Sequence, residues 1–134
     1  MNYKYLLIIF FLVSCTTNST KLENRIPYNS KGFAYIYNDN DFDMKIIKGK
    51  LDNNELQISL PYLKINALIK LINPKTNDNL IIKNSKKIKF PDFYKVMITE
   101  KVAQTLNIDK SLPLIEILEI KKNKSFIAKK AKIF

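Results

Sequence analysis

Apolar and polar positions alternate over short stretches of this chain, and the alternation predicts strands. In residues 56–60, two leucines and Ile58 fall on one side, while Gln57 and Ser59 fall on the other. Other short runs are rich in the β-branched, leucine and aromatic residues that strands favour. They span residues 32–37, 44–50, 67–72, 80–83, 88–90, 94–98 and 114–120.

The segments between these runs indicate one hairpin and one helix. Residues 73–79 separate two of the runs and contain Pro74 and three asparagines, which favour a turn. Residues 99–106 predict a helix, because their apolar side chains recur at helical spacing. Thr99 can cap its start and Asn107 can end it. Many short strands with one short helix predict a mainly β fold, a small closed barrel.

The first residues have the pattern of an export signal. Residues 5–13 (YLLIIFFLV) form an apolar run that is too short for a membrane span, which needs about 20 residues. The run suits the core of a signal peptide. Leu12-Val13-Ser14-Cys15 follows the lipobox pattern, which places small or apolar residues before a cysteine that is lipidated after cleavage. The alternative is a cysteine within an ordinary signal peptide or a buried strand.

This pattern predicts the organisation of the chain. Residues 1–14 are expected to be a lipoprotein signal peptide, and residues 15–31 the lipidated Cys15 with a polar tether. Residues 32–120 are expected to form the barrel, and residues 121–134 a basic tail. Thr16, rather than an aspartate, follows the cysteine. In a Gram-negative host this would direct the protein to the outer membrane, facing the periplasm.

The charge of the chain favours anionic partners. Lysine and arginine total 23 against 12 acidic residues, which gives a formal net charge of +11. Such a surface attracts nucleic acid, acidic glycan or anionic lipid. The alternative is a solvated lysine surface, and part of the lysine content is typical of coding bias in an AT-rich genome. For this exported chain we expect no nucleic-acid partner.

Several classes of chemistry lack their usual residues. The chain has no histidine, the commonest general base near neutral pH, and one cysteine, so it cannot form an intramolecular disulfide. Its glycines are Gly32 and Gly49, which excludes glycine-rich phosphate-binding motifs. Neither a cofactor nor a metal site is therefore expected.

The order of predicted elements resembles the rare lipoprotein A (RlpA-like) double-psi β-barrel family over roughly residues 32–120. Residues 32–37 (GFAYIY) are similar to the family's Gly-x-Ala-Ser-Tyr-Tyr-like opening. Residues 58–73 align without a gap with its next block, where Asn66 takes a glycine position suited to a left-handed backbone. Residues 96–99 and 102–107 are similar to its final Ile-Asp-Leu-Ser block and helix.

The resemblance implies a fold and a function. Members have a six-stranded double-psi barrel, are typically exported and lipid-anchored, and bind peptidoglycan; some cleave it as lytic transglycosylases. This chain departs from the pattern at three polar positions. Leu60 replaces the family's histidine, and Ser85 and Met97 replace two aspartates. Because the apolar framework remains and these groups are lost, the resemblance favours the fold and indicates a pseudoenzyme.

A few polar and aromatic residues are candidates for a site. Asp92 is the carboxylate framed by aromatic residues, in Phe90-Pro91-Asp92-Phe93-Tyr94, and is a weak catalytic candidate. The favoured alternative is a loop turn with two half-buried phenylalanines. Residues 86–89 are a lysine-rich loop that could contact glycan or could simply be solvated. The glycan-binding candidates are Asn84, Lys86, Lys87, Phe93 and Tyr94.

These features lead to one expected function and two alternatives. We expect a monomeric, lipid-anchored cell-envelope protein that binds peptidoglycan or another anionic glycan and is not catalytic. One alternative is an active lytic transglycosylase that uses Asp92 or another carboxylate. The other is a basic lipoprotein that contacts anionic lipid or a protein partner. The lysines of the tail could contact lipid headgroups or glycan, or belong to a disordered end.

Overall fold

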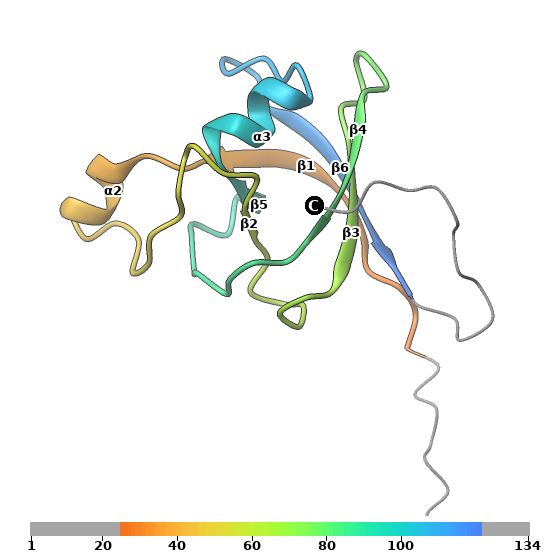
Figure 1. Cartoon of the computed structure of the whole chain (residues 1–134), viewed down its shortest axis with the longest axis horizontal. Coiled ribbons are helices and arrows are strands. Elements are labelled where there is room, and N and C mark those ends of the chain that lie inside the picture. Colours follow the sequence, from red (N-terminus) through yellow and green to blue (C-terminus); the bar gives the residue numbers. More distant parts are fainter. Residues whose placement is uncertain (1–24, 122–134) are drawn as a thin grey trace, which may run out of the picture.

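The computed structural model describes residues 25–121, which form a mainly β fold of six strands and two short helices (Figure 1). The predicted signal peptide, Cys15 and most of the basic tail lie outside the described residues. Among residues 25–121, no helix is long and apolar enough to cross a bilayer. The elements are β1 (Asn29–Ile36), α2 (Asp39–Asp43), β2 (Ile58–Ser59), β3 (Leu68–Ile72), β4 (Asn79–Lys83), β5 (Tyr94–Ile98), α3 (Glu100–Thr105) and β6 (Leu114–Ile120).

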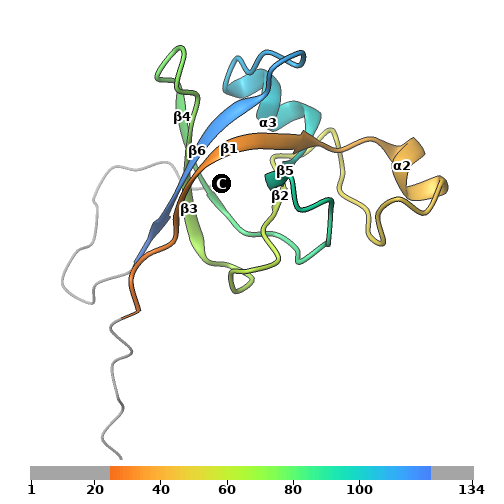
Figure 2. The ribbon, with the colours of Figure 1, turned by 180° about the vertical axis from the view of Figure 1, so that it is seen from behind.

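The strands form one sheet that curls into a nearly closed barrel. Their order is β2-β5-β1-β6-β3-β4, in which β1 and β5 pair in parallel and the other neighbours are antiparallel. A parallel bridge between Ser59 and Lys86 brings the chain that follows β4 back to β2. Figure 2 shows the same arrangement from behind. The bridge joins edge strand β2 to the segment that follows the other edge strand, β4, so the sheet comes close to closing.

The interior of the barrel is filled by alternate side chains of the strands. β1 contributes Ala34, β5 contributes Val96 and Ile98, and α3 closes one end with Val102 and Ala103. The remaining buried members of this cluster are Ile58, Leu60, Leu63, Ile69, Leu71, Leu80, Ile82, Leu106, Ile108, Ile115 and Ile117. Removal of this apolar surface from water is the main source of stability of the barrel.

A second apolar cluster lies outside the barrel. Its buried members are Tyr37, Ile47, Leu51, Ile88 and Met97, and Tyr35, Phe42 and Phe90 pack against it. Since β1 and β5 also contribute to the interior, both of these strands are covered on two faces. The covering chain includes α2 and the turns that follow it, which project to one side of the barrel (Figure 1).

Three sequence expectations about backbone geometry can be compared with the structure. Asn66 has a positive φ of 67°, as expected from its glycine-like position, and Asn107 ends the helical turn with a φ of 51°. Thr99 is the N-cap residue of α3, but its hydroxyl donates to the carbonyl of Glu55 instead. The backbone N–H of Glu100 donates to Asn53 Oδ1 at 2.9 Å, so another loop caps the helix.

Two predicted strands are wrong. Residues 44–50 form turns and bends after α2, where Lys45 has a φ of 60° and only Ile47 of the apolar residues is buried. Residues 88–90 carry no strand pairing, and Ile88 packs into the second cluster. The helix α2 was not predicted, because Asp39–Asp43 is almost entirely polar. The first strand begins at Asn29, three residues before the predicted start at Gly32.

Candidate functional site

Five aromatic side chains gather on the outer side of β1 and β5. Phe33 and Tyr35 of β1 alternate with Ala34, which enters the barrel; Phe93 directly precedes β5 and Tyr94 begins it. The parallel pairing sets Phe33 opposite Tyr94, which brings Phe33 beside Phe93 and Tyr35 beside Tyr94. We call Phe33, Tyr35, Phe90, Phe93 and Tyr94 the aromatic face.

The rings of the aromatic face are in direct contact. Phe33 stacks on Phe93 with ring centroids 5.1 Å apart, and Tyr94 meets both Phe93 and Tyr35 edge to face at 5.2 Å and 5.0 Å. Phe90 stacks more loosely on Tyr35 at 6.4 Å. These spacings are those of favourable aromatic pairs. The cluster is therefore a pre-formed surface, although Phe93 remains 64% exposed.

An open hollow of about 530 Å³ lies over part of this face. Four members of the aromatic face line it, together with Asp41 after β1 and Lys110, Ser111 and Pro113 before β6. The volume falls within the range of small-molecule pockets, and apolar walls with a few polar groups are their usual composition. We call it the aromatic hollow.

The polar groups around the aromatic hollow are held by neighbours. The hydroxyl of Tyr35 donates to Asp41 Oδ2 at 2.5 Å, and burial together with this bond raises the pKa of Tyr35 above its usual value of 10.0. Lys110 forms an ion pair with Glu100 and holds the pKa of that carboxyl below its usual value. The rim thus carries fixed charges and donors at neutral pH.

A smaller hollow of about 270 Å³ adjoins the aromatic face at Phe90. It is also lined by Pro61, Tyr62, Lys89 and Asp92. Asp92 is exposed, and so are its neighbours Pro91 and Phe93. The aromatic residues that flank Asp92 in the sequence therefore do not enclose its carboxylate. Asp92 is exposed to solvent and lines the smaller hollow with Lys89.

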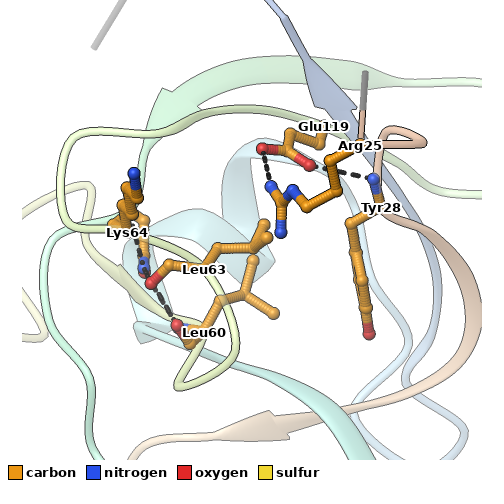
Figure 3. A network of polar contacts seen from close by, with 7 residues as sticks. Arg25, Tyr28, Leu60, Leu63, Lys64 and Glu119 are labelled. Carbon is orange, nitrogen blue, oxygen red and sulfur yellow. Dashed lines mark hydrogen bonds and ion pairs between the residues drawn. The ribbon is translucent and has the colours of Figure 1, made fainter. Parts of the chain in front are cut away.

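Asn84 has a structural role, which corrects its prediction as a glycan contact. It has no exposed surface, and its amide accepts from the N–H of Leu60 at 2.9 Å and donates to the carbonyl of Leu60 at 2.9 Å. Its amide also donates to the carbonyls of Leu63 and Lys64, at 3.2 Å and 3.3 Å. Figure 3 shows these three backbone groups converging, with Arg25, Tyr28 and Glu119 nearby. Asn84 thus secures the loop that joins β2 to β3.

The other predicted contacts are divided between two places. Phe93 and Tyr94, two of the predicted glycan-binding residues, both belong to the aromatic face. Lys86 and Lys87 are exposed, and neither lines the two hollows described here. Lys86 Nζ donates instead to the carbonyl of Lys50 at 2.6 Å.

The three positions aligned with the polar residues of the RlpA-like family do not converge. Leu60 is buried in the barrel interior, whereas Met97 is buried in the second cluster on the opposite side of the sheet. Ser85 is partly exposed, and its N–H donates to the carbonyl of Ile58 at 3.1 Å. An acid or base at Leu60 or Met97 would have no access to a substrate in this structure.

Sequence reasoning predicted only Phe93 and Tyr94 among the residues that line the aromatic hollow. Phe33 and Tyr35 lay in a predicted strand, and their alternation with Ala34 is a signal that was available. Asp41 and Lys110 carried no such signal, because α2 and the loop before β6 meet the strands only through tertiary packing. A strand pattern identifies the two faces, but it does not say which face stays open.

The aromatic hollow offers ring surfaces together with a few polar side chains at its rim. With no histidine in the chain, Ser111 has no imidazole to activate it. Within residues 25–121, no cluster of three histidine, cysteine or carboxylate side chains could hold a metal ion. The sequence matches no protein-family model and no curated protein, so the geometry of the aromatic face is the basis for assigning a function.

Proposed function

We propose that this protein is an exported, lipid-anchored binding protein that holds peptidoglycan or another anionic glycan on its aromatic face. The observation that carries the proposal is the exposed ring of Phe93, pre-stacked on the half-buried Phe33 at the edge of an open hollow. A sugar ring has an apolar face of C–H groups and a polar edge. Aromatic rings with nearby donors and acceptors suit such an amphipathic ligand.

Charge supports an anionic glycan over a neutral one. The formal net charge of +11 raises the local concentration of anions near the surface. Lys89 lines the smaller hollow, and Lys110, which is paired with Glu100, lines the aromatic hollow. A glycan on this face would meet the ring surfaces together with the ammonium group of Lys89.

We also propose that the barrel has the double-psi topology of the RlpA-like family. Two parallel contacts support it: β1 with β5, and Ser59 with Lys86. Each joins segments that are far apart in sequence, so the connecting chains must cross the barrel to return in parallel. An experimental structure in which these connections run side by side without crossing would exclude this topology.

We propose further that binding occurs without cleavage. General acid–base catalysis requires a titrating group within hydrogen-bond reach of the sugar. Leu60 and Met97 cannot serve, and Asp41 already accepts the hydroxyl of Tyr35. Asp92 lines the smaller hollow, and within the described residues its carboxylate accepts no such hydrogen bond. It therefore supports the alternative of an active transglycosylase.

The experiment that tests the proposal is sedimentation of the purified full chain with peptidoglycan sacculi, followed by product analysis of the same sample. We expect the protein to sediment with the sacculi and to release no anhydro-muropeptides. Asp92→Asn is expected to sediment like wild type. Release of anhydro products by wild type, abolished by Asp92→Asn, would establish the enzyme instead.

A further inference from the structure

Several strands begin or end at the same end of the barrel. Leu68, at the start of β3, pairs with Lys83 at the end of β4 and with Ile120 at the end of β6. Asn29 pairs with Leu118, so β1 begins at the same end. In Figure 1 these segments and the loop that precedes β3 lie at the bottom, and Figure 2 agrees.

The side chains of this end are basic with isolated apolar residues among them. Ile26 is 85% exposed and Ile65 is 54% exposed. Lys64, Lys83 and Lys121 are exposed around them, and Arg25 pairs with Glu119, the carboxylate of this end, at 2.6 Å. We call Ile26, Lys64, Ile65, Lys83 and Lys121 the basic end.

The opposite end of the barrel differs in charge balance. It carries α3 and the loops before β4 and β6, where lysines and carboxylates are paired. Lys75 lies 3.7 Å from Asp109, and Lys110 pairs with Glu100. The basic end therefore has more unpaired positive charge than the α3 end.

We infer that the basic end is a contact surface for an anionic lipid bilayer. Lysines attract the negative charge of the headgroups, and exposed isoleucines can enter the interfacial region between them. Each lysine close to an anionic leaflet strengthens binding roughly fivefold. The aromatic face lies on the side of the barrel, so a protein seated on its basic end would leave that face open.

The orientation of the protein on the membrane rests on the proposed lipid anchor. The charge and exposure of the basic end are properties of the described residues. Cys15 precedes Arg25 by ten residues, which can span at most about 35 Å. Arg25 is fixed to β6 through Glu119 at the basic end. A lipid on Cys15 would consequently keep Arg25, and with it the basic end, within about 35 Å of the membrane.

A pair of matched tryptophan reporters tests the inference. The chain has no tryptophan, and Ile65 and Ile46 are nearly equally exposed, at 54% and 53%, with Ile46 on the turns after α2. The full chain carrying Ile65→Trp or Ile46→Trp is reconstituted with vesicles of phosphatidylcholine, with or without phosphatidylglycerol, whose acyl chains carry bromine quenchers. We expect loss of emission for Ile65→Trp in the anionic vesicles and little for Ile46→Trp.

Charge variants and vesicle flotation distinguish failure of the basic-end inference from failure of the lipid anchor. Adding Lys64→Glu and Lys83→Glu to Ile65→Trp should lower the equilibrium constant for seating at least about 25-fold, because it removes two positive charges and adds two negative ones, and should restore emission. Equal quenching at both reporters, or equal quenching in neutral vesicles, would overturn the inference. Protein that floats with vesicles but shows no quenching of Ile65→Trp would also overturn it, while leaving the anchor intact. Protein that does not float with either vesicle would contradict both the anchor and the basic end.

Discussion

The ring of Phe33 stacks on the ring of Phe93, with centroids 5.1 Å apart and planes inclined by 14°. Phe33 belongs to β1 and Phe93 precedes β5, so the contact joins segments that meet only through parallel strand pairing. The pair is not a core contact, because Phe93 keeps 64% of its surface exposed. Because stacking already holds the Phe93 ring in place, a ligand that stacks on it causes little further loss of side-chain conformational freedom.

Asn84→Ala should destabilise the protein strongly. The amide of Asn84 is fully buried and satisfies backbone groups of Leu60, Leu63 and Lys64. Alanine would leave several buried polar groups without partners, at a cost of about 2–4 kcal/mol. Urea unfolding measures the change, and Asn79→Ala, in an exposed position, is the control expected within about 0.5 kcal/mol. Similar unfolding midpoints for both variants would refute the structural role of Asn84.

Met97→Asp should be far more damaging than Ser85→Asp. Both changes restore the residue of the RlpA-like pattern, but Met97 is fully buried among apolar side chains and Ser85 is partly exposed. A buried carboxyl without a partner is expected to cost more than about 4 kcal/mol, whereas Ser85→Asp should stay within about 1 kcal/mol. Thermal unfolding of the two variants decides this. A stable Met97→Asp protein would mean that the position borders a site after all.

Stability should fall at alkaline pH because of Tyr37. Burial, followed by the 2.7 Å hydrogen bond to Asp39, raises the pKa of the Tyr37 hydroxyl to about 12. An unfolded tyrosine ionises near its usual pKa of 10.0, so between these values the unfolded state has lost the proton that the folded state keeps. The stabilisation is therefore complete below about pH 10 and is lost as pH rises through about 12.

Tyr37→Phe isolates this contribution. At neutral pH the variant should lose about 1 kcal/mol with the hydrogen bond to Asp39. Between about pH 10 and 12 its free energy of unfolding should decline less steeply than that of wild type, as measured by urea unfolding at several pH values. Tyr62→Phe, at an exposed position, is the matched control. Parallel declines for wild type and Tyr37→Phe would show that Tyr37 does not contribute.

Cys15→Ser tests the anchor. The apolar run of residues 5–13 is followed by the lipobox-like Leu12-Val13-Ser14-Cys15, and lipidation requires the thiol. We expect the variant to remain unprocessed and to lose acyl label when cells are fed a labelled fatty acid. Label that persists in Cys15→Ser would contradict lipidation at this residue.

The parts of the fold that sequence could predict are those governed by local pattern. The hairpin of β3 and β4, the helix α3 and the strands β5 and β6 follow from strand-favouring composition, turn residues and helical spacing. The segment after α2 misled the prediction, because Met44 and Ile46 look strand-like but remain exposed. The contacts that order this segment are tertiary: Ile47 is buried with Ile88 and Met97 in the second cluster, and Lys86 Nζ donates to the carbonyl of Lys50.

The candidate site was less predictable for the same reason. Phe93 and Tyr94 stood out as aromatics beside a carboxylate, but their partners come from β1 and from the loop before β6. Asn84 was singled out as a polar residue in a lysine-rich loop, and burial reversed its role. Periodicity tells which residues share a face, but the closing of the barrel decides which of them ligands can reach.

The central claim is that the aromatic face binds glycan, and its most direct test compares Phe93→Ala with Met44→Ala. The two side chains are 64% and 63% exposed, but only Phe93 lies on the aromatic face. Binding of the full chain to purified sacculi is titrated for wild type and both variants. We predict that Phe93→Ala weakens the apparent Kd roughly tenfold, as expected for loss of one stacking ring, and that Met44→Ala binds like wild type. Equal binding by all three proteins, or no binding by wild type, would contradict the assignment.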